Sequence, residues 1–209
     1  MGFEGLLGNA RLKENLRHSV DSGRLSHFYL ISGPKGSGKR TLARLLAAAA
    51  VCRDKNKPCL ACPACRKAMT NNHPDIITVT DPDHKAVAVK IVRQYREDVY
   101  IKPNEADKKV YIFPQELGTE GQNALLKILE EPPSYGVFLL LAENPQQILT
   151  TVRSRCTLLQ MESLPSQLLL SQLEKQFPNA EREQLQAAAE RSGGYLGQAV
   201  DLVKEGEVV

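Results

Sequence analysis

The residues best suited to chemistry form a glycine-rich segment, Gly33-Pro34-Lys35-Gly36-Ser37-Gly38-Lys39. Its spacing matches the pattern G-x-x-x-x-G-K-[ST], in which backbone amides and the lysine hold the phosphates of a nucleotide. A hydroxyl that ligates Mg²⁺ should follow the lysine, but the chain has Arg40 there. A guanidinium only donates hydrogen bonds, so it does not replace a magnesium ligand. Thr41 lies about 100° further around the following helix, and we expect it to point elsewhere.

The acidic half of such a nucleotide site is also missing. An active ATPase of this type needs carboxylates at the end of a neighbouring strand, to hold Mg²⁺ and orient the attacking water. The best candidate strand spans 109–113, and Pro114-Gln115 follows it. Neither residue is a metal-binding carboxylate or a general base. Glu116 is one position further along, where an extended chain turns its side chain to the opposite face, so we expect it on the surface.

Four cysteines form a second chemical cluster, C-x6-C-x2-C-x2-C, at Cys52, Cys59, Cys62 and Cys65. Thiolates at this spacing suit a tetrahedral Zn²⁺ ion, and four protein ligands make the site structural rather than catalytic. The alternatives are free buried thiols, a disulfide pair in an oxidising compartment, or a redox C-x-x-C. The prolines around the cluster favour tight loops. Cys156 is far away in the sequence, and we interpret it as a packed thiol.

Apolar segments alternate between strand-like and helical patterns, which predicts an α/β fold with a parallel, doubly wound sheet. The expected strands span 28–31, 75–80, 109–113, 137–142 and 157–161. The expected helices of this part span 9–20, 39–52, 87–100, 122–130 and 145–151. From about residue 164 the strands stop, and three helical segments at 165–176, 180–192 and 196–205 predict a small second domain.

Composition places the chain among ordinary globular proteins, with 209 residues, 42% hydrophobic and 24% charged. The start shows no secretory signal, and the apolar stretches at 45–51 and 137–142 are too short to span a bilayer. We therefore expect a cytoplasmic protein without a membrane partner. The net charge of +3 is compatible with a zinc-containing nucleic-acid-binding module. The cysteine segment lacks the interleaved aromatics and dense basic run that would favour that alternative.

Five further stretches, in this order along the chain, carry a resemblance: Arg24-Leu25-Ser26-His27-Phe28-Tyr29-Leu30, the cysteine cluster, Asn123-Ala124-Leu125-Leu126-Lys127-Ile128-Leu129-Glu130-Glu131-Pro132-Pro133, Val152-Arg153-Ser154-Arg155-Cys156, and Ser192-Gly193-Gly194-Tyr195-Leu196-Gly197-Gln198-Ala199. The chain resembles the bacterial clamp-loader subunits of DNA polymerase III, the gamma/tau and delta-prime group of AAA+ proteins. The matching stretches are spread along nearly the whole length of the sequence, in the family's order.

The resemblance implies an AAA+ domain over 1–163, with a zinc module at about 52–65, and a helical lid domain over 164–209. Family members carry a further collar domain that builds a pentameric ring, and it is absent from these 209 residues, so we expect a fragment. The implied partners are gamma/tau-type and delta subunits. The sliding clamp and primer-template DNA are reached through the complex.

Departures from the family pattern indicate which type of subunit the chain resembles. The gamma-type motor has a threonine after the loop lysine, an acidic pair after the strand, a threonine near the end of the next strand, and a lid arginine. Here those positions read Arg40, Pro114-Gln115, Ala142-Glu143-Asn144 and Gly197. The pattern resembles delta-prime, and it implies weak or absent binding of ATP or ADP. Lys39 then either holds a phosphate or only caps a turn.

The Ser154-Arg155-Cys156 motif is intact, unlike the nucleotide site. In the family its arginine reaches the ATP of a neighbouring subunit. An arginine supplied in trans stabilises charge on the transferring phosphoryl group and needs no nucleotide of its own. Arg155 is therefore the expected catalytic residue, although outside the family pattern it would be taken for a surface arginine. The remaining alternative is an active gamma/tau-type ATPase that uses Thr41 and Glu116 as displaced substitutes.

Overall fold

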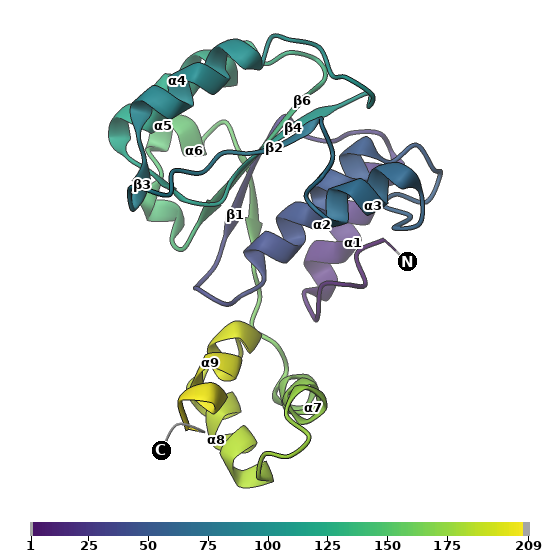
Figure 1. Cartoon of the computed structure of the whole chain (residues 1–209), viewed down its shortest axis with the longest axis vertical. Helices are drawn as coiled ribbons and strands as arrows, with labels where there is room; N and C mark the ends of the chain where they lie inside the picture. Colours follow the sequence, from purple (N-terminus) through teal and green to yellow (C-terminus); the bar gives the residue numbers. More distant parts are fainter. Residues whose placement is uncertain (1, 207–209) are drawn as a thin grey trace.

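A five-stranded parallel sheet organises the protein in the computed structural model, which describes residues 2–206 (Figure 1). The spatial order is β2-β4-β6-β1-β7. The strands are β1 Phe28–Ser32, β2 Ile76–Thr78, β4 Lys109–Phe113, β6 Gly136–Ala142 and β7 Thr157–Gln160. Every residue of β1, β4 and β6 is buried, which explains their continuous apolar runs. The five strands expected from the sequence are confirmed.

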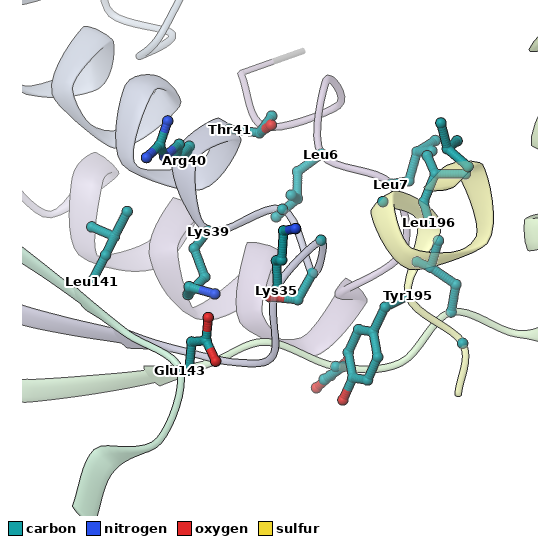
Figure 2. A pocket seen from close by; sticks show the side chains of 18 of the residues that line it. Leu6, Leu7, Lys35, Lys39, Arg40, Thr41, Leu141, Glu143, Tyr195 and Leu196 are labelled. Carbon is teal, nitrogen blue, oxygen red and sulfur yellow. The ribbon is translucent and has the colours of Figure 1, made fainter. Parts of the chain in front are cut away.

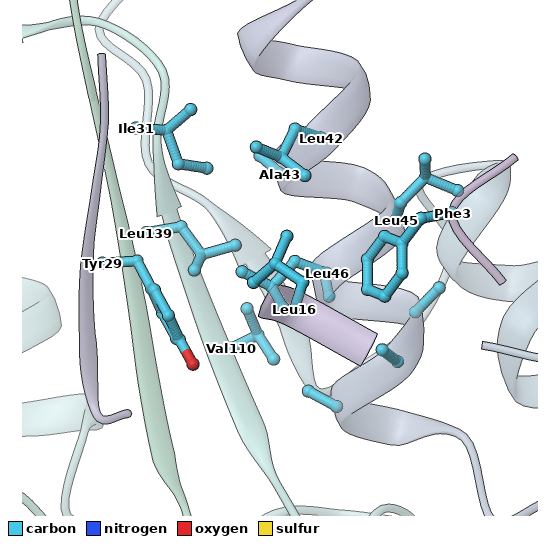
Figure 3. Close-up of a cluster of buried hydrophobic side chains, with 14 of the residues drawn as sticks. Phe3, Leu16, Tyr29, Ile31, Leu42, Ala43, Leu45, Leu46, Val110 and Leu139 are labelled. Atoms are coloured by element: carbon cyan, nitrogen blue, oxygen red, sulfur yellow. The ribbon is translucent and has the colours of Figure 1, made fainter. Parts of the chain in front are cut away.

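Helices cover both faces of this sheet, so the doubly wound class is confirmed (Figure 1). One face carries α1 Ala10–Asp21, α2 Lys39–Val51 and α3 Pro63–Met69, and the other carries α4 Val89–Asp98, α5 Thr119–Glu130 and α6 Thr150–Arg153. Figure 3 shows Leu42 and Leu46 of α2 against Ile31 and Leu139 of the sheet. Small alanines at 47–50 are all buried and let α2 approach the sheet closely.

Two local expectations were wrong, and two short strands were not expected. The segment around Pro58 is a loop, as expected, but Pro63 opens α3 at a position where its missing N–H costs nothing. The helix expected at 145–151 divides into η1 Pro145–Gln147 and α6, because the backbone is extended at Ile148 and Leu149. Two short strands, β3 Ala86–Val87 and β5 Glu116–Leu117, pair outside the main sheet. With two residues each, these strands are too short to show the alternation of apolar and polar residues that predicts a strand.

The three helices expected after residue 164 are present, and they share an apolar cluster. They are α7 Ser166–Gln176, α8 Arg182–Arg191 and α9 Leu196–Gly206. Their shared buried residues are Leu169, Leu173, Leu185, Ala188, Ala199 and Val203. Between residues 2 and 206, no helix is long and apolar enough to cross a membrane.

The first turn of α9 packs directly on the glycine-rich loop. The Gly197 amide donates to the Gly36 carbonyl at 2.9 Å, and Gln198 Nε2 donates to the Lys35 carbonyl at 3.0 Å. A Cβ on Gly197 would lie 2.5 Å from Gly36 Cα, far inside normal contact distance. Gly36 has φ +77°, and a Cβ there would lie 2.6 Å from the Gln198 nitrogen. Both positions therefore require glycine for this close approach.

Replacing Gly197 with alanine tests this packing. We expect Gly197→Ala to lift α9 from the loop at a cost of about 1–3 kcal/mol, because the new methyl meets backbone rather than a flexible side chain. Hydrogen exchange should accelerate at residues 34–38 and 196–199. The control is Gly121→Ala inside α5, where the nearest atom to the new Cβ is 3.6 Å away. That variant should be unchanged or more stable by up to about 1 kcal/mol. Unchanged exchange in Gly197→Ala would contradict the proposed packing role.

Candidate nucleotide and metal sites

The glycine-rich loop lies between β1 and α2, at the carboxyl ends of the parallel strands, where α/β proteins bind ligands. The left-handed backbone of Gly36 (φ 77°) and Gly38 (φ 94°) allows the chain to turn sharply before α2 begins at Lys39. The strand, loop and helix expected from the sequence are all present. They orient the loop toward a cavity of about 810 Å³.

Lys39 faces the loop, and its ammonium group donates two hydrogen bonds to loop carbonyls. Nζ donates to the carbonyls of Gly33 at 2.6 Å and Pro34 at 2.8 Å. Burial lowers the pKa of Lys39, the Glu143 carboxylate acts in the opposite direction, and Arg40 lowers it further. Figure 2 shows Glu143 directed toward the ammonium group, while Arg40 extends away from it. Arg40 therefore does not stand in for the missing hydroxyl.

The cavity has an apolar end and a charged end. Leu6, Leu7 and Leu196 form part of the apolar end, near Tyr195 of the α9 approach (Figure 2). Lys39 and the loop form the charged end. An apolar wall beside a loop of backbone amides suits a base at one end and phosphates at the other. The volume is within the range of small-molecule sites.

Gln115 stands where an acidic residue would serve an ATPase, and its amide holds a neighbouring loop. Oε1 accepts from the Asp81 amide at 2.9 Å, and Nε2 donates to the carbonyls of Asp81 at 3.0 Å and Lys85 at 2.8 Å. Nε2 also contacts the His84 carbonyl. Sequence reasoning identified the missing carboxylate but missed this structural role, because the partners lie 30 to 34 residues away.

Glu116 is exposed on β5, as expected, and its carboxylate lies 3.8 Å from Lys85 Nζ. It also lines the rim of the cavity, as does Thr41. Figure 2 shows the Thr41 side chain directed away from Lys39, as the helical geometry predicts.

The structure brings the four cysteines together, with all Sγ atoms within 4.8 Å of one another. The Cys52–Cys62 and Cys59–Cys65 sulfurs are 4.0 Å and 3.9 Å apart. Tetrahedral Zn–S bonds of about 2.3 Å place sulfurs about 3.8 Å apart, so the donor set fits a metal ion. Backbone amides donate to Cys59 Sγ at 3.3 Å and Cys62 Sγ at 3.4 Å, which favours thiolates.

The protonation of these thiols differs with their surroundings. Hydrogen bonds from the amides of Ala61 and Cys62 lower the pKa of Cys59 to about 7. Burial raises the pKa of Cys65 and of Cys52. A dication would offset that desolvation by holding both as thiolates. Cys156 is partly buried against α6, and burial raises its pKa to about 11, consistent with the packed thiol expected from the sequence.

One segment ties the cysteine module to the sheet. Arg53 donates to the Glu105 carbonyl at 2.7 Å, and Lys67 donates to the Glu105 carboxylate at 2.6 Å. The fully buried Asp75 carboxylate accepts from the amides of Glu105 and Ala106, both at 2.8 Å. Asp75 immediately precedes β2, so the module is anchored to the edge of the sheet.

Arg155 lies just after α6 and just before β7, away from the glycine-rich loop. Its NH1 group donates to the Thr151 carbonyl at 2.7 Å, and NH2 is 3.8 Å from Glu130 Oε1. The side chain keeps 40% of its surface exposed. The structure therefore brings the loop residues together with one another and the cysteines with one another, and it holds Arg155 apart from both groups.

Comparison with known proteins identifies relatives of the chain. The family described as DNA polymerase III, delta subunit, matches residues 8–165. DNA polymerase III subunit delta' of Bacillus subtilis is 34% identical over 169 residues, covering 79% of this chain and 51% of its own length. DNA polymerase III subunit tau of the same species is 30% identical over 212 residues, covering 97% of this chain and 37% of its own length. The chain thus spans a third to a half of these relatives.

Solved structures support the fold. A gamma subunit-related protein of DNA polymerase III from Thermotoga maritima has a TM-score of 0.56 at 22% identity, covering 85% of this chain and 57% of its own. The RuvB Holliday junction branch migration motor from the same species has a TM-score of 0.60 at 16% identity, covering 94% and 61%. These likenesses confirm the α/β fold with a parallel sheet that the sequence predicts.

The cysteine cluster leads to a prediction about the metal. The purified protein should contain about one equivalent of zinc, and Cys62→Ser should lose most of it and unfold at a lower temperature, because one of four ligands is gone. Elemental analysis and thermal denaturation measure both effects. Cys156→Ser is the matched control, since this thiol lies outside the cluster, and it should keep the metal. Equal zinc contents in the two variants would exclude the proposed ligand set.

The contacts of Gln115 lead to a further prediction. Gln115→Glu should destabilise the protein by about 2 kcal/mol, because a carboxylate cannot donate and would face three carbonyl oxygens. Gln160→Glu on exposed β7 makes the same chemical change and should stay within about 0.5 kcal/mol of the parent. Chemical denaturation measures both values. Equal stabilities would show that the Gln115 amide does not hold the loop.

Proposed function

Because the chain belongs to the DNA polymerase III clamp-loader subunit family, we propose that it supports sliding-clamp loading in DNA replication as a delta-prime-like subunit. In this proposal it does not hydrolyse ATP and supplies Arg155 to the ATP site of a neighbouring gamma-type subunit. The delta-prime comparison and the replaced nucleotide-site residues support that choice.

The position of Arg155 relative to its own loop carries the proposal. The strands β1 and β7 run parallel, with Tyr29 opposite Thr157 and Ser32 opposite Gln160. Arg155 precedes β7 and the glycine-rich loop follows β1, so they lie at opposite ends of the sheet. Four to five residues of strand separate the two ends by roughly 13–17 Å. Arg155 therefore lies too far from the glycine-rich loop of its own chain to act there, as expected of an arginine that acts in trans.

The loss of hydrolysis is supported by several side chains around the cavity. Arg40 offers no oxygen for Mg²⁺, and the Gln115 amide is occupied by the loop at 81–85. Gly197 stands at the position of the lid arginine and packs on Gly36. Binding of ATP or ADP would therefore be weak or absent, and nucleotide would not be turned over.

The same proposal assigns the remaining features. An AAA+ unit at 1–163 and a lid at 164–209 would work within a complex that includes gamma/tau-type and delta subunits. The sliding clamp and primer-template DNA would be reached through that complex. The cysteine site would hold structural Zn²⁺ in a closed, four-ligand shell. A bacterial replication complex would place the protein in the cytoplasm.

An active gamma/tau-type ATPase is the second candidate. The match to subunit tau extends over 97% of this chain, and Thr41 and Glu116 both line the cavity. Single-turnover hydrolysis by the full-length protein distinguishes the two. Hydrolysis that Lys39→Ala abolishes would establish the ATPase and reject the delta-prime-like role.

Removal of the proposed finger provides the direct test. In a reconstituted loader, Arg155→Ala should reduce DNA-dependent turnover at the neighbouring ATP site by about 10³-fold, because an arginine finger contributes at least this much. Arg153→Ala is the control, since its guanidinium bonds to the Pro145 carbonyl and Gln146 within its own chain. Unchanged turnover in an intact Arg155→Ala complex would remove the proposed role.

A further inference from the structure

Glu143 occupies a position beside the glycine-rich loop that strand pairing determines. Ser32 is opposite Ala142 in the parallel pair β1–β6, and the Gly33 amide donates to the Ala142 carbonyl at 3.2 Å. Glu143 is the next residue, so it lies beside the start of the loop. Figure 2 shows its carboxylate directed toward the ammonium group of Lys39. An anionic side chain thus enters the end of the cavity that suits phosphates.

The charges around the cavity also disfavour a polyanion. Its lining includes three cations, Lys35, Lys39 and Arg40, and four carboxylates, Glu116, Glu143, Glu162 and Asp201. Three positive and four negative charges leave a formal charge of −1. A triphosphate would add several more negative charges to this cavity. A phosphate that approaches Lys39 also approaches the Glu143 carboxylate, which repels it.

We propose that Glu143 is the resident counter-ion of the glycine-rich loop and a specificity-determining residue of this cavity. Its carboxylate balances Lys39 where a terminal phosphate would otherwise do so, and it repels that phosphate. The cavity therefore discriminates against triphosphates relative to diphosphates. This inference rests on the proposed function, in which the subunit has no need of ATP, and it identifies the side chain that disfavours the triphosphate.

The opposite role for Glu143 would be that of a magnesium ligand. Carboxylates are normal Mg²⁺ ligands, and one beside the loop would then strengthen the binding of Mg²⁺-ATP. The two roles predict opposite effects when the charge is removed. As a counter-ion, Glu143 weakens ATP binding with or without magnesium. As a ligand, it strengthens ATP binding only when magnesium is present.

The test is calorimetric titration of the 209-residue protein with ATP, ADP and inorganic tripolyphosphate, each with and without Mg²⁺. Glu143→Gln should raise the affinity for ATP and tripolyphosphate at least about tenfold, and the affinity for ADP less, because the removed charge faces the terminal phosphate. Glu97→Gln is the matched control. It makes the same chemical change at an exposed position of α4, outside the residues that line the cavity, so its affinities should change less than about twofold.

Each other outcome overturns the proposal. An unchanged ratio of ATP to ADP affinity would show that Glu143 does not discriminate, and weaker Mg²⁺-ATP binding would assign it to a metal. Glu143→Ala repeats the measurement in case the glutamine variant folds poorly, and undetectable ATP binding by both variants also contradicts it. Hydrolysis is measured in the same samples. Turnover by the unaltered protein would reject the proposed function, whatever the affinity ratio shows about Glu143.

Discussion

The pairing of β1 with β6 on one side and β7 on the other is the constraint on which the rest of the structure depends. Because all three strands run in the same direction, the residues immediately after β1 and β6 lie at one end of the sheet. The residues immediately before β7 lie at the other end. The glycine-rich loop and Glu143 belong to the first end, and Arg155 belongs to the second. One chain therefore presents two chemically different surfaces that do not meet within it.

Residues at positions where the sequence departs from the ATPase pattern make specific contacts within the fold. Gln115 holds the loop at 81–85, and Gly197 allows α9 to touch Gly36. A carboxylate at position 115 could not donate to the carbonyls of that loop, and a side chain at position 197 would meet the Gly36 backbone. These departures from the motor pattern are thus coupled to their surroundings.

The sequence was sufficient to predict the main sheet, the last three helices and the grouping of the cysteines, since apolar periodicity and C-x-x-C spacing are local signals. It was not sufficient for β3 and β5, which have two residues each and owe their pairing to distant contacts. It also missed that Pro63 opens a helix. The contacts of Gln115 and Glu143 depend on which strands are neighbours, and that information is absent from any single segment.

The position of β7 at the end of the sheet has a consequence for the protein on its own. A terminal strand leaves one row of backbone groups without a strand partner, which invites pairing with another chain. This strand has four residues, and its side chains alternate little in exposure, with Leu158 49% exposed. Its short length limits how many hydrogen bonds an incoming strand can gain. Self-association through this edge should therefore be shallow and reversible rather than the start of an extended aggregate.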